Sequence, residues 1–425
     1  MSKQILTRLD EFDPLWIVFQ IPTLTGELKE IHISREEISD NIFEEGYDIE
    51  GFIGKGEVKL VPRAESYAEV PWYPRTVRFL TYLRESSGVR HPLDLYYPLQ
   101  KLLKKLDIMI RPAISFHVVE GYTADRVTKE RGPSISFDSK EGKWNPVAYY
   151  IPQKAYSAFP YDAYYGIRQQ IAELLKVFGY GVKKHYHGEG TSQQVISLDA
   201  MDGVKAAEAI LSLKYISRAI APAANVQVTY MPYLIPNEPG NFLQLEILGL
   251  FQDGELTQEG RYFIGGLLSH YKTLLLFTNP TPNSYKRLLL EPYYRAWGQN
   301  VSNVMVNVIK ERVVLSFPDA IANPFLAYTA ILAAGLDGIK ESVDPGDPIK
   351  TSPRMLSTPE KRQKKIKEFP KDFLTVIEEL ESDSEYLKGV LPPELLIEYV
   401  EGRYKEIRDN LSQPTAYELE RYFHR

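Results

Sequence analysis

The sequence predicts an α+β fold in which a small strand-rich domain precedes a larger domain of strands and helices. Three observations support this class. Short β-branched and aromatic runs separated by turn residues occupy Leu15 to Leu60, a helical leucine repeat begins after His91-Pro92, and strand-like and helix-like segments follow from there. A chain of 425 residues has room for about two or three domains. We expect two, covering residues 1–90 and 91–425.

The N-terminal domain is expected to contain a sheet of short strands. Trp16–Ile21 and Ile31–Ile33 are rich in residues that favour strands, and Thr25-Gly26-Glu27 between them supplies turn residues. The larger domain is expected to open with a helix over 95–106, because leucines recur there at helical spacing, namely Leu95, Leu99, Leu102, Leu103 and Leu106.

Further elements of the larger domain follow from the same patterns. We expect strands at Ile108–Glu120, Val226–Leu234 and Asn241–Phe251, and a hairpin of Asn303–Ile309 with Val313–Phe317. Helices are expected at Tyr165–Phe178, which Gly179 would end, at Val204–Ile220 and at Tyr262–Leu276. The region from Ser352 to Arg425 is charged and expected to be helical.

The clearest local prediction is a helix that begins after Asn323. Asparagine is a strong N-cap, and Pro324 would occupy the first helical position, where a missing N–H costs nothing. One apolar stripe then follows at helical spacing, formed by Phe325, Tyr328, Leu332, Leu336 and Ile339. The sequence therefore predicts a helix buried along one face.

Composition excludes several classes of function. The net charge is −6 and the one basic cluster, at 361–367, is short, so neither nucleic-acid binding nor binding to an anionic membrane is expected. No signal pattern and no apolar run of about 20 residues is evident, so we expect a cytoplasmic protein. The absence of cysteine excludes disulfides, thiolate metal sites and a cysteine nucleophile, and together with 29 prolines it suggests a thermophile.

Two segments carry a family resemblance. Asn279-Pro280-Thr281-Pro282-Asn283-Ser284-Tyr285-Lys286-Arg287, and Phe317-Pro318-Asp319 with the helix that runs on to Gly335-Leu336-Asp337-Gly338, closely resemble signature segments of glutamine synthetase. Weaker matches extend over nearly the whole chain. The resemblance implies an N-terminal β-grasp domain and a larger catalytic-type domain with a curved antiparallel sheet flanked by helices. It also implies a ring-shaped homo-oligomer, commonly two stacked hexamers, whose cavity is completed by the neighbouring subunit.

Active members of this family join glutamate to ammonia after phosphorylating the glutamate side chain with ATP, a reaction that belongs to nitrogen metabolism. Phosphoryl transfer of this kind needs divalent cations, which prefer carboxylate oxygens with an occasional imidazole. The family therefore places glutamates and histidines around its cavity. The first pair, in the pattern Gly-x-Glu-x-Glu-Phe, corresponds here to Ala113 and Ser115, which share a strand face with His117.

The remaining family ligands are also replaced. In His185-Tyr186-His187-Gly188-Glu189, an alignment anchored on Gln193 puts His187 and Val195 at ligand positions, and a shift by two residues would instead offer Glu189. The family's strand histidines correspond to Phe242 and Gln244, and its next glutamate to Val314. The arginine-rich segment that grips ATP phosphates corresponds to Asn300–Val306, which contains no arginine.

Five positions match the family's substrate cleft and are predicted to be vestigial substrate-binding residues: Glu57, Asn237, Gly240, Arg287 and Arg312. Two of them have an alternative interpretation, because Arg287 would serve equally well in a structural ion pair and Glu57 as a surface carboxylate.

We therefore predict a pseudoenzyme with no catalytic residue, no metal ligand and no cofactor. It would have a binding, regulatory or assembly role, and its partners would be a small anionic ligand, an active family member or other copies of itself. Two alternatives stay open. One is an ATP-dependent ligase that joins glutamate to ammonia or an amine through relocated ligands, and the other is a metal enzyme built on His185 and His187, whose spacing on a strand suits Zn²⁺.

Overall fold

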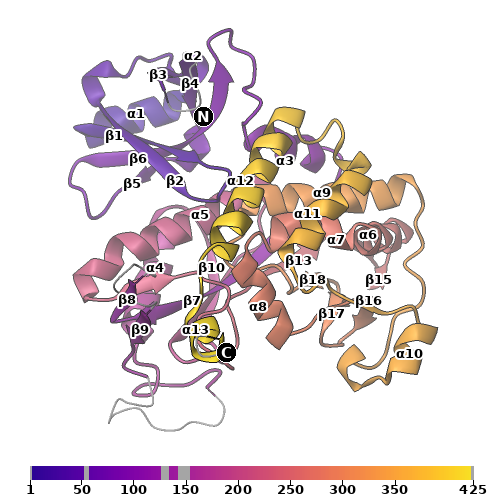
Figure 1. Ribbon diagram of the computed structural model, residues 1–425. Coiled ribbons are helices and arrows are strands. Elements are labelled where there is room, and N and C mark those ends of the chain that lie inside the picture. Colours follow the sequence, from indigo (N-terminus) through magenta and orange to yellow (C-terminus); the bar gives the residue numbers. More distant parts are fainter. Residues whose placement is uncertain (1, 52–56, 126–133, 142–153, 423–425) are drawn as a thin grey trace.

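The described residues fold around two large β-sheets, one of six strands and one of nine; Figure 1 shows their arrangement. This computed structural model describes residues 2–51, 57–125, 134–141 and 154–422. Among the helices it describes, none combines the length and the apolar character that crossing a bilayer requires. The small sheet lies in the N-terminal part of the chain and the large sheet in the remainder, as the sequence predicted.

The small sheet has the strand order β2-β1-β6-β4-β3, with β5 beside β6. β1 and β6 run parallel, and the other neighbours are antiparallel. One apolar cluster, which includes Ile17, Phe19, Leu60 and Phe79, fills its core. The elements of this unit are α1 (Ser2–Phe12), β1 (Trp16–Pro22), β2 (Leu28–Ser34), α2 (Ile42–Glu45), β3 (Tyr47–Glu50), β4 (Glu57–Pro62), β5 (Ala68–Glu69) and β6 (Thr76–Glu85).

The large sheet has the order β10-β11-β7-β13-β18-β17-β16-β19, with β12 also paired to β7. Every neighbouring pair is antiparallel except β16 and β17. Its strands are β7 (Met109–Val119), β10 (Val182–His187), β11 (Gln193–Leu198), β12 (Gln227–Thr229), β13 (Leu243–Leu248), β16 (Tyr294–Gln299), β17 (Val304–Val308), β18 (Val313–Leu315) and β19 (Lys367–Glu368). Two hairpins stand apart from it, formed by β8 (Gly121–Asp125) with β9 (Ser134–Asp138) and by β14 (Phe251–Gln252) with β15 (Glu255–Leu256).

Helices flank the large sheet, and α5 and α9 are buried over most of their length. The helices of this unit are α3 (Tyr96–Leu103), α4 (Tyr165–Val177), α5 (Gly203–Ile220), α6 (Gln258–Ser269), α7 (Tyr271–Thr278), α8 (Pro282–Leu290), α9 (Pro324–Lys340), α10 (Thr358–Gln363), α11 (Phe373–Ser382), α12 (Pro393–Leu411) and α13 (Ala416–Tyr422).

The predicted start of α9 is confirmed. The Asn323 side chain accepts hydrogen bonds from the backbone N–H groups of Phe325 and Leu326, and Pro324 is the first helical residue. The same side chain donates to the carbonyl oxygens of Thr23 (2.9 Å) and Leu24 (3.2 Å) in the turn after β1. One residue thus caps a central helix and binds the N-terminal unit to it.

Glycines allow α6 and α9 to pack closely. A Cβ atom added at Gly266 would lie 2.0 Å from the carbonyl oxygen of Ala334, and one added at Gly338 would lie 2.3 Å from that of Tyr262. Neither position has room for a side chain. The glycine at the end of the Gly335-Leu336-Asp337-Gly338 signature is therefore explained by helix packing.

Three predicted elements differ from those observed. The helix expected over Tyr262–Leu276 is two helices, α6 and α7, which meet at His270. The strand expected over Asn241–Phe251 ends at Leu248, because Gly249 has a φ of +100° that favours glycine. The strand expected over Val226–Leu234 is the shorter β12.

His270 lies between α6 and α7, and its ring contacts Asp337 of α9 and Asp383 at the end of α11. Nδ1 lies 2.7 Å from Asp383 Oδ1 and Nε2 lies 3.0 Å from Asp337 Oδ2, so both ring nitrogens face carboxylates. Burial lowers the pKa of His270, but the hydrogen bonds to both aspartates outweigh it and the pKa lies above its ordinary value. The imidazolium form therefore fits this position best.

The raised pKa of His270 predicts a pH-dependent contribution to stability. The folded protein holds the proton more tightly than the unfolded chain, so the contribution is full below about pH 6.5 and is lost as pH rises through the folded-state pKa. We expect His270→Gln to lower the unfolding free energy by about 1–2 kcal/mol at pH 5.5, and by less at pH 9. Denaturant unfolding at both pH values measures this, and an equal loss at both would contradict it.

Candidate functional site

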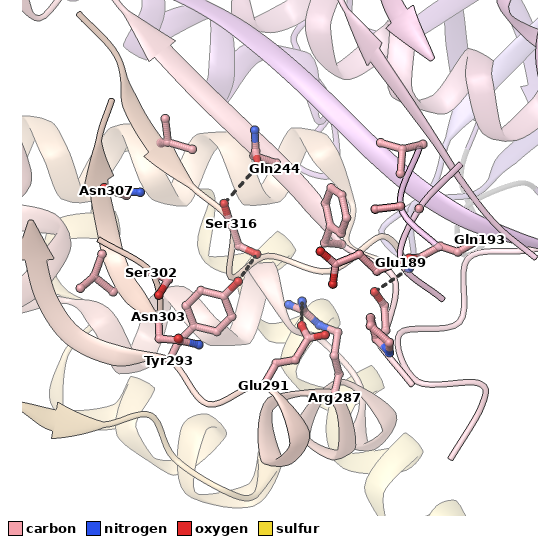
Figure 2. Close-up of a pocket in the computed structure, with 18 of the residues that line it drawn as sticks. Glu189, Gln193, Gln244, Arg287, Glu291, Tyr293, Ser302, Asn303, Asn307 and Ser316 are labelled. Carbon is pink, nitrogen blue, oxygen red and sulfur yellow. Dashed lines mark hydrogen bonds and ion pairs between the residues drawn. The ribbon is translucent and has the colours of Figure 1, made fainter. Parts of the chain in front are cut away.

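A cavity of about 500 Å³ opens at one end of the large sheet (Figure 2). The turn between β10 and β11, the residues around the start of β13, the end of α8, the segment before β17 and the end of β18 all contribute to its wall. The residues that line it include Tyr156, Tyr186, Glu189, Val195, Gly240, Phe242, Gln244, Arg287, Glu291, Val301, Val304, Asn307, Val314 and Ser316.

Part of the wall is apolar. Val195, Val301, Val304 and Val314 line it, and each is at most 5% exposed. Val301 and Val304 belong to a small apolar cluster with Tyr294, Ala296 and Ile366, whereas Val195 and Val314 are buried strand residues outside the apolar clusters. The ring of Phe242 lies beside them in the cavity.

Neither Ala113 nor Ser115 is among the described residues that line the cavity. Ala113 lies opposite Gln244 and Ser115 opposite Val195, so both face the same side of the sheet as these lining residues. Ser115 is fully buried, and its hydroxyl oxygen accepts the backbone N–H of Phe242 at 2.8 Å. That hydroxyl is therefore part of the backbone hydrogen-bond framework.

The polar part of the wall is mostly neutral. Ser316 Oγ donates to Gln244 Oε1 at 3.2 Å, and Asn307 Oδ1 accepts the backbone N–H of Val301 at 3.1 Å. Tyr156 and Tyr186 also line the cavity, and they stack with their ring centroids 4.6 Å apart. Amides, hydroxyls and aromatic rings of this kind suit an uncharged or weakly charged small molecule.

Arg287 is buried in the wall, and its own chain uses its guanidinium. Nη2 donates to the carbonyl oxygen of Phe317 and, at 3.3 Å, to that of Pro318, while Nη1 lies 3.7 Å from Glu291 Oε2 (Figure 2). Gly240 packs against the same side chain, since a Cβ atom there would lie 2.7 Å from Arg287 Cγ. This arginine is fixed before any ligand arrives.

Two carboxylates face the cavity with Arg287. Burial raises the pKa of Glu291, and the charge of Glu189 adds to the rise, while Arg287 and the backbone N–H of Gly240 oppose it. Glu189 is exposed. Sequence reasoning missed Glu291, although its place four residues after Arg287 on a helix was a usable signal for an ion pair.

The five predicted substrate-binding residues do not all meet. Gly240 and Arg287 line the cavity. Arg312 lies outside this lining and pairs with Glu246 at 2.8 Å, the same carboxylate that Arg111 binds. Asn237 is exposed, and Glu57 is exposed on β4 of the small sheet, where Ser86 Oγ lies 3.4 Å from its carboxylate.

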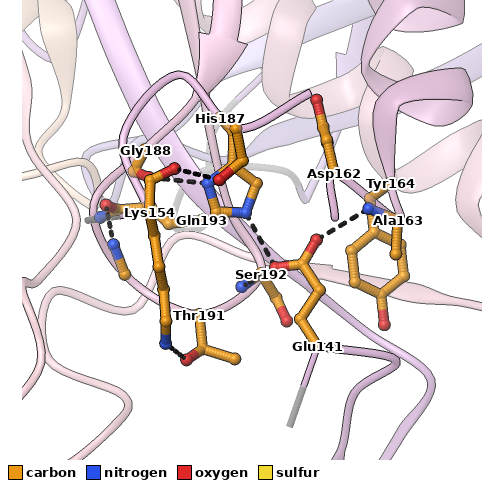
Figure 3. A network of polar contacts seen from close by, with 12 residues as sticks. Glu141, Lys154, Asp162, Ala163, Tyr164, His187, Gly188, Thr191, Ser192 and Gln193 are labelled. Atoms are coloured by element: carbon orange, nitrogen blue, oxygen red, sulfur yellow. Dashed lines mark hydrogen bonds and ion pairs between the residues drawn. The ribbon is translucent and has the colours of Figure 1, made fainter. Parts of the chain in front are cut away.

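His185 and His187 each bind protein groups, and Figure 3 shows those around His187. His187 Nδ1 lies 2.7 Å from the carbonyl oxygen of Gly188 and Nε2 lies 2.8 Å from Glu141 Oε2. His185 Nδ1 accepts from Arg168 Nε at 3.1 Å, and burial and this arginine lower its pKa. Within the described residues, no three histidine, aspartate or glutamate side chains come close enough together to hold a metal ion.

The Glu141 carboxylate belongs to a network that fixes the turn between β10 and β11. It accepts the backbone N–H groups of Ser192 (2.6 Å) and Ala163 (3.0 Å) as well as the bond from His187. In the same turn, the Thr191 N–H donates to Glu238 at 2.6 Å, and Glu238 also pairs with Lys154 at 3.1 Å. These contacts hold the part of the cavity wall that carries Gly188 and Glu189.

His117 lies deeper on the same strand face as Ser115. It is fully buried, and no described residue makes a hydrogen bond to either ring nitrogen. Burial lowers its pKa to about 4. The ring is therefore neutral at pH 7.

Comparison with known proteins relates this chain to one family. The family model described as "Glutamine synthetase, catalytic domain" matches residues 103–422. Glutamine synthetase of Pyrococcus furiosus is 31% identical, over 93% of this chain and 92% of that protein, and that of Sulfolobus acidocaldarius is 28% identical, over 96% and 95%.

Solved structures show the same fold. A structure titled "Apo GmaS without ligand" covers all of this chain and is itself covered in full, with a TM-score of 0.82 at 22% identity. A cryo-EM structure of Plasmodium falciparum glutamine synthetase covers 99% of this chain, over 98% of its own length, with a TM-score of 0.86 at 18% identity. The predicted fold class is therefore confirmed.

The contacts of Arg287 predict a structural effect of its removal. Arg287→Met leaves the carbonyl of Pro318 and the carboxylate of Glu291 without this partner, so we expect a loss of about 2–4 kcal/mol in the free energy of unfolding. Lys286→Met, the same change at the exposed neighbour, should stay within about 0.5 kcal/mol of wild type. Thermal or denaturant unfolding measures both, and equal losses would argue against a structural role.

Proposed function

The chain belongs to the glutamine synthetase family, and we propose that it is a member without ligase activity that acts by binding a small molecule or a protein partner. The single observation that carries this proposal is the cavity wall. Valines at positions 195 and 314 and the Phe242 ring stand where the family resemblance expects carboxylate and imidazole ligands for divalent cations. Valine and phenylalanine side chains have no atom that can coordinate a cation.

Charge supports the same proposal. Among the described residues, the charged groups that line the cavity are Arg287, Glu291 and Glu189, which carry one positive and two negative formal charges. The guanidinium of Arg287 is already bound to two carbonyl oxygens and faces Glu291. Phosphate oxygens placed there would lack counter-charge, which costs on the order of several kcal/mol per buried group. We infer that an uncharged or weakly charged ligand fits better than ATP.

The assembly is part of the proposal. We propose a homo-oligomer of stacked rings in the cytoplasm, as the family resemblance implies. In such a ring the exposed Glu57 would face a neighbouring subunit. An active family member could take a place in the same ring, which would give a subunit without activity a regulatory role.

A second candidate is an ATP-dependent ligase with relocated ligands. Its support is that relatives named glutamine synthetase match more than nine-tenths of the chain, and that Glu189 and Glu291 face the cavity together. Two carboxylates that face one cavity can share a divalent cation.

A measurement of turnover distinguishes the member without ligase activity from the ATP-dependent ligase. We expect phosphate release from ATP with glutamate and ammonium, or with amines in place of ammonium, to stay at the level of a heat-denatured blank at any Mg²⁺ or Mn²⁺ concentration. The glutamine synthetase of Pyrococcus furiosus serves as the positive control. Metal-dependent turnover well above the blank would refute the proposal.

A measurement of Mg²⁺ and ATP binding distinguishes the same two candidates without relying on turnover. A ligand that binds only the native state raises the melting temperature by mass action, so Mg²⁺ with ATP should leave the melting temperature of this protein unchanged. If relocated ligands exist, the melting temperature should rise in wild type and the rise should disappear in Glu189→Gln. That pair of results would favour the ligase.

A further inference from the structure

A second pocket, of about 360 Å³, lies where the N-terminal unit meets helix α5 of the large unit. We call it the α5 pocket. One side of it is formed by the start of β2 and by the segment between β5 and β6, and the other side by the C-terminal half of α5, which Figure 1 shows beside the N-terminal unit. A pocket of this volume can hold a small molecule. The lining residues that matter here are Glu27, Glu30, Trp72, Lys214, Tyr215 and Arg218, and none of them lines the cavity at the end of the large sheet.

Lys214 brings a buried amino group to the α5 pocket. The residue is 5% exposed, and Nζ donates to the carbonyl oxygen of Ala322 at 3.2 Å. Burial, helped by the charge of Arg218, lowers the pKa of Lys214 to about 7. The charges of Asp319 and Glu27 oppose this without preventing it, and no described carboxylate forms an ion pair with Nζ. An ammonium has three donors, so an anion could still bind this one and would offset the cost of burying its charge.

Arg218 places a second cation on the same face of α5. It follows Lys214 by four residues, which is about one helical turn. Its guanidinium lies 5.6 Å from the ring centre of Tyr230, and Lys214 Nζ lies 5.6 Å from the same centre. Arg218 is exposed and forms no hydrogen bond or ion pair with a described residue. Both cations therefore have N–H donors available to a ligand.

The two glutamates of the α5 pocket do not neutralise these cations. Glu30 already accepts from Gln20 Nε2 at 3.2 Å and lies 3.3 Å from His32 Nε2. Glu27 is exposed, so water solvates its charge. Their negative charges would still repel a doubly charged group such as a phosphate more strongly than a carboxylate. One ammonium and one guanidinium thus suit a single carboxylate.

Aromatic rings form another part of the wall. Trp72 and Tyr215 line the pocket with their ring centroids 5.5 Å apart and their planes tilted by 52°. Trp72 also stacks on Phe178, with centroids 5.9 Å apart and planes 23° apart. These contacts hold Trp72 in place before a ligand binds. A ring fixed in this way offers a preformed surface for a planar apolar group.

We propose that the α5 pocket binds a planar aromatic carboxylate, whose anionic group contacts Lys214 and Arg218 and whose ring packs against Trp72 and Tyr215. Such a ligand touches the N-terminal unit and the large unit at once, because both contribute to the wall. The α5 pocket is separate from the cavity, so this inference does not depend on the function proposed above.

Isothermal titration calorimetry of the full chain with indole-3-acetate tests the ligand class. We expect saturable binding with a Kd of about 1 mM or below, as the size of this probe allows. Indole-3-acetamide has the same ring without the charge, and acetate has the charge without the ring. Each should bind at least about tenfold more weakly. No saturable binding of indole-3-acetate, or equal affinity for the acid and the amide, would overturn the proposal.

Three variants locate the bound probe. Lys214→Met and Arg218→Met should each raise the Kd about tenfold or more, because each removes a charged donor. Lys205→Met makes the same change at an exposed position of α5 and should leave the Kd unchanged. Circular dichroism checks folding, and Arg218→Met remains informative if the change at the buried Lys214 reduces stability. Wild-type affinity in both Lys214→Met and Arg218→Met would place the probe elsewhere and refute the site.

The pH dependence of binding isolates the role of Lys214. A carboxylate binds the protonated amine, and Lys214 loses this proton as pH rises through about 7. The Kd of wild type should therefore rise about tenfold between pH 6.5 and pH 8.5. Arg218→Met should bind more weakly and keep this rise, whereas Lys214→Met should bind more weakly and lack it. A wild-type Kd that does not change with pH would contradict the contact between the carboxylate and Lys214.

Discussion

The buried guanidinium of Arg287 is the contact on which the cavity and the centre of the large unit both depend. It joins the end of α8 to the carbonyl oxygens of Phe317 and Pro318, just before α9. Asp319 follows at once and is fully buried; burial raises its pKa to about 6, and the charge of Arg287 opposes that rise. The cavity wall is thus built on a buried charge that is held by carbonyl oxygens and a carboxylate of the same chain.

The residues that fix the shape of the cavity differ from those whose side chains give it its chemical character. Arg287, Gly240 and the turn fixed by Glu141 determine where the wall stands, and they do so through contacts with protein atoms. Val195, Phe242 and Val314 also line the cavity, and their side chains take no part in those contacts. A family member can therefore keep its cavity and lose its reaction.

The structural features that could be predicted from the sequence are those that depend on contacts between neighbouring residues. The start of α9 followed from Asn323 and Pro324, because capping involves only neighbouring residues. The break at His270 could not be predicted, because its partners Asp337 and Asp383 lie 67 and 113 residues further on. The pairing of Arg312 with Glu246 was missed for the same reason, since 66 residues separate them and only the sheet register brings them together.

Several polar residues of the signature segments have structural partners. Asn279 donates to the carbonyl of Phe317 at 2.9 Å, Thr281 and Ser284 form a capping box for α8, and Asn283 exchanges hydrogen bonds with the backbone of Tyr233. Asn323 caps α9 and holds the turn after β1. Each of these residues would be required in a protein that never met a substrate. The signature is therefore evidence for the fold and the packing of its helices, and the side chains that line the cavity must be judged separately for activity.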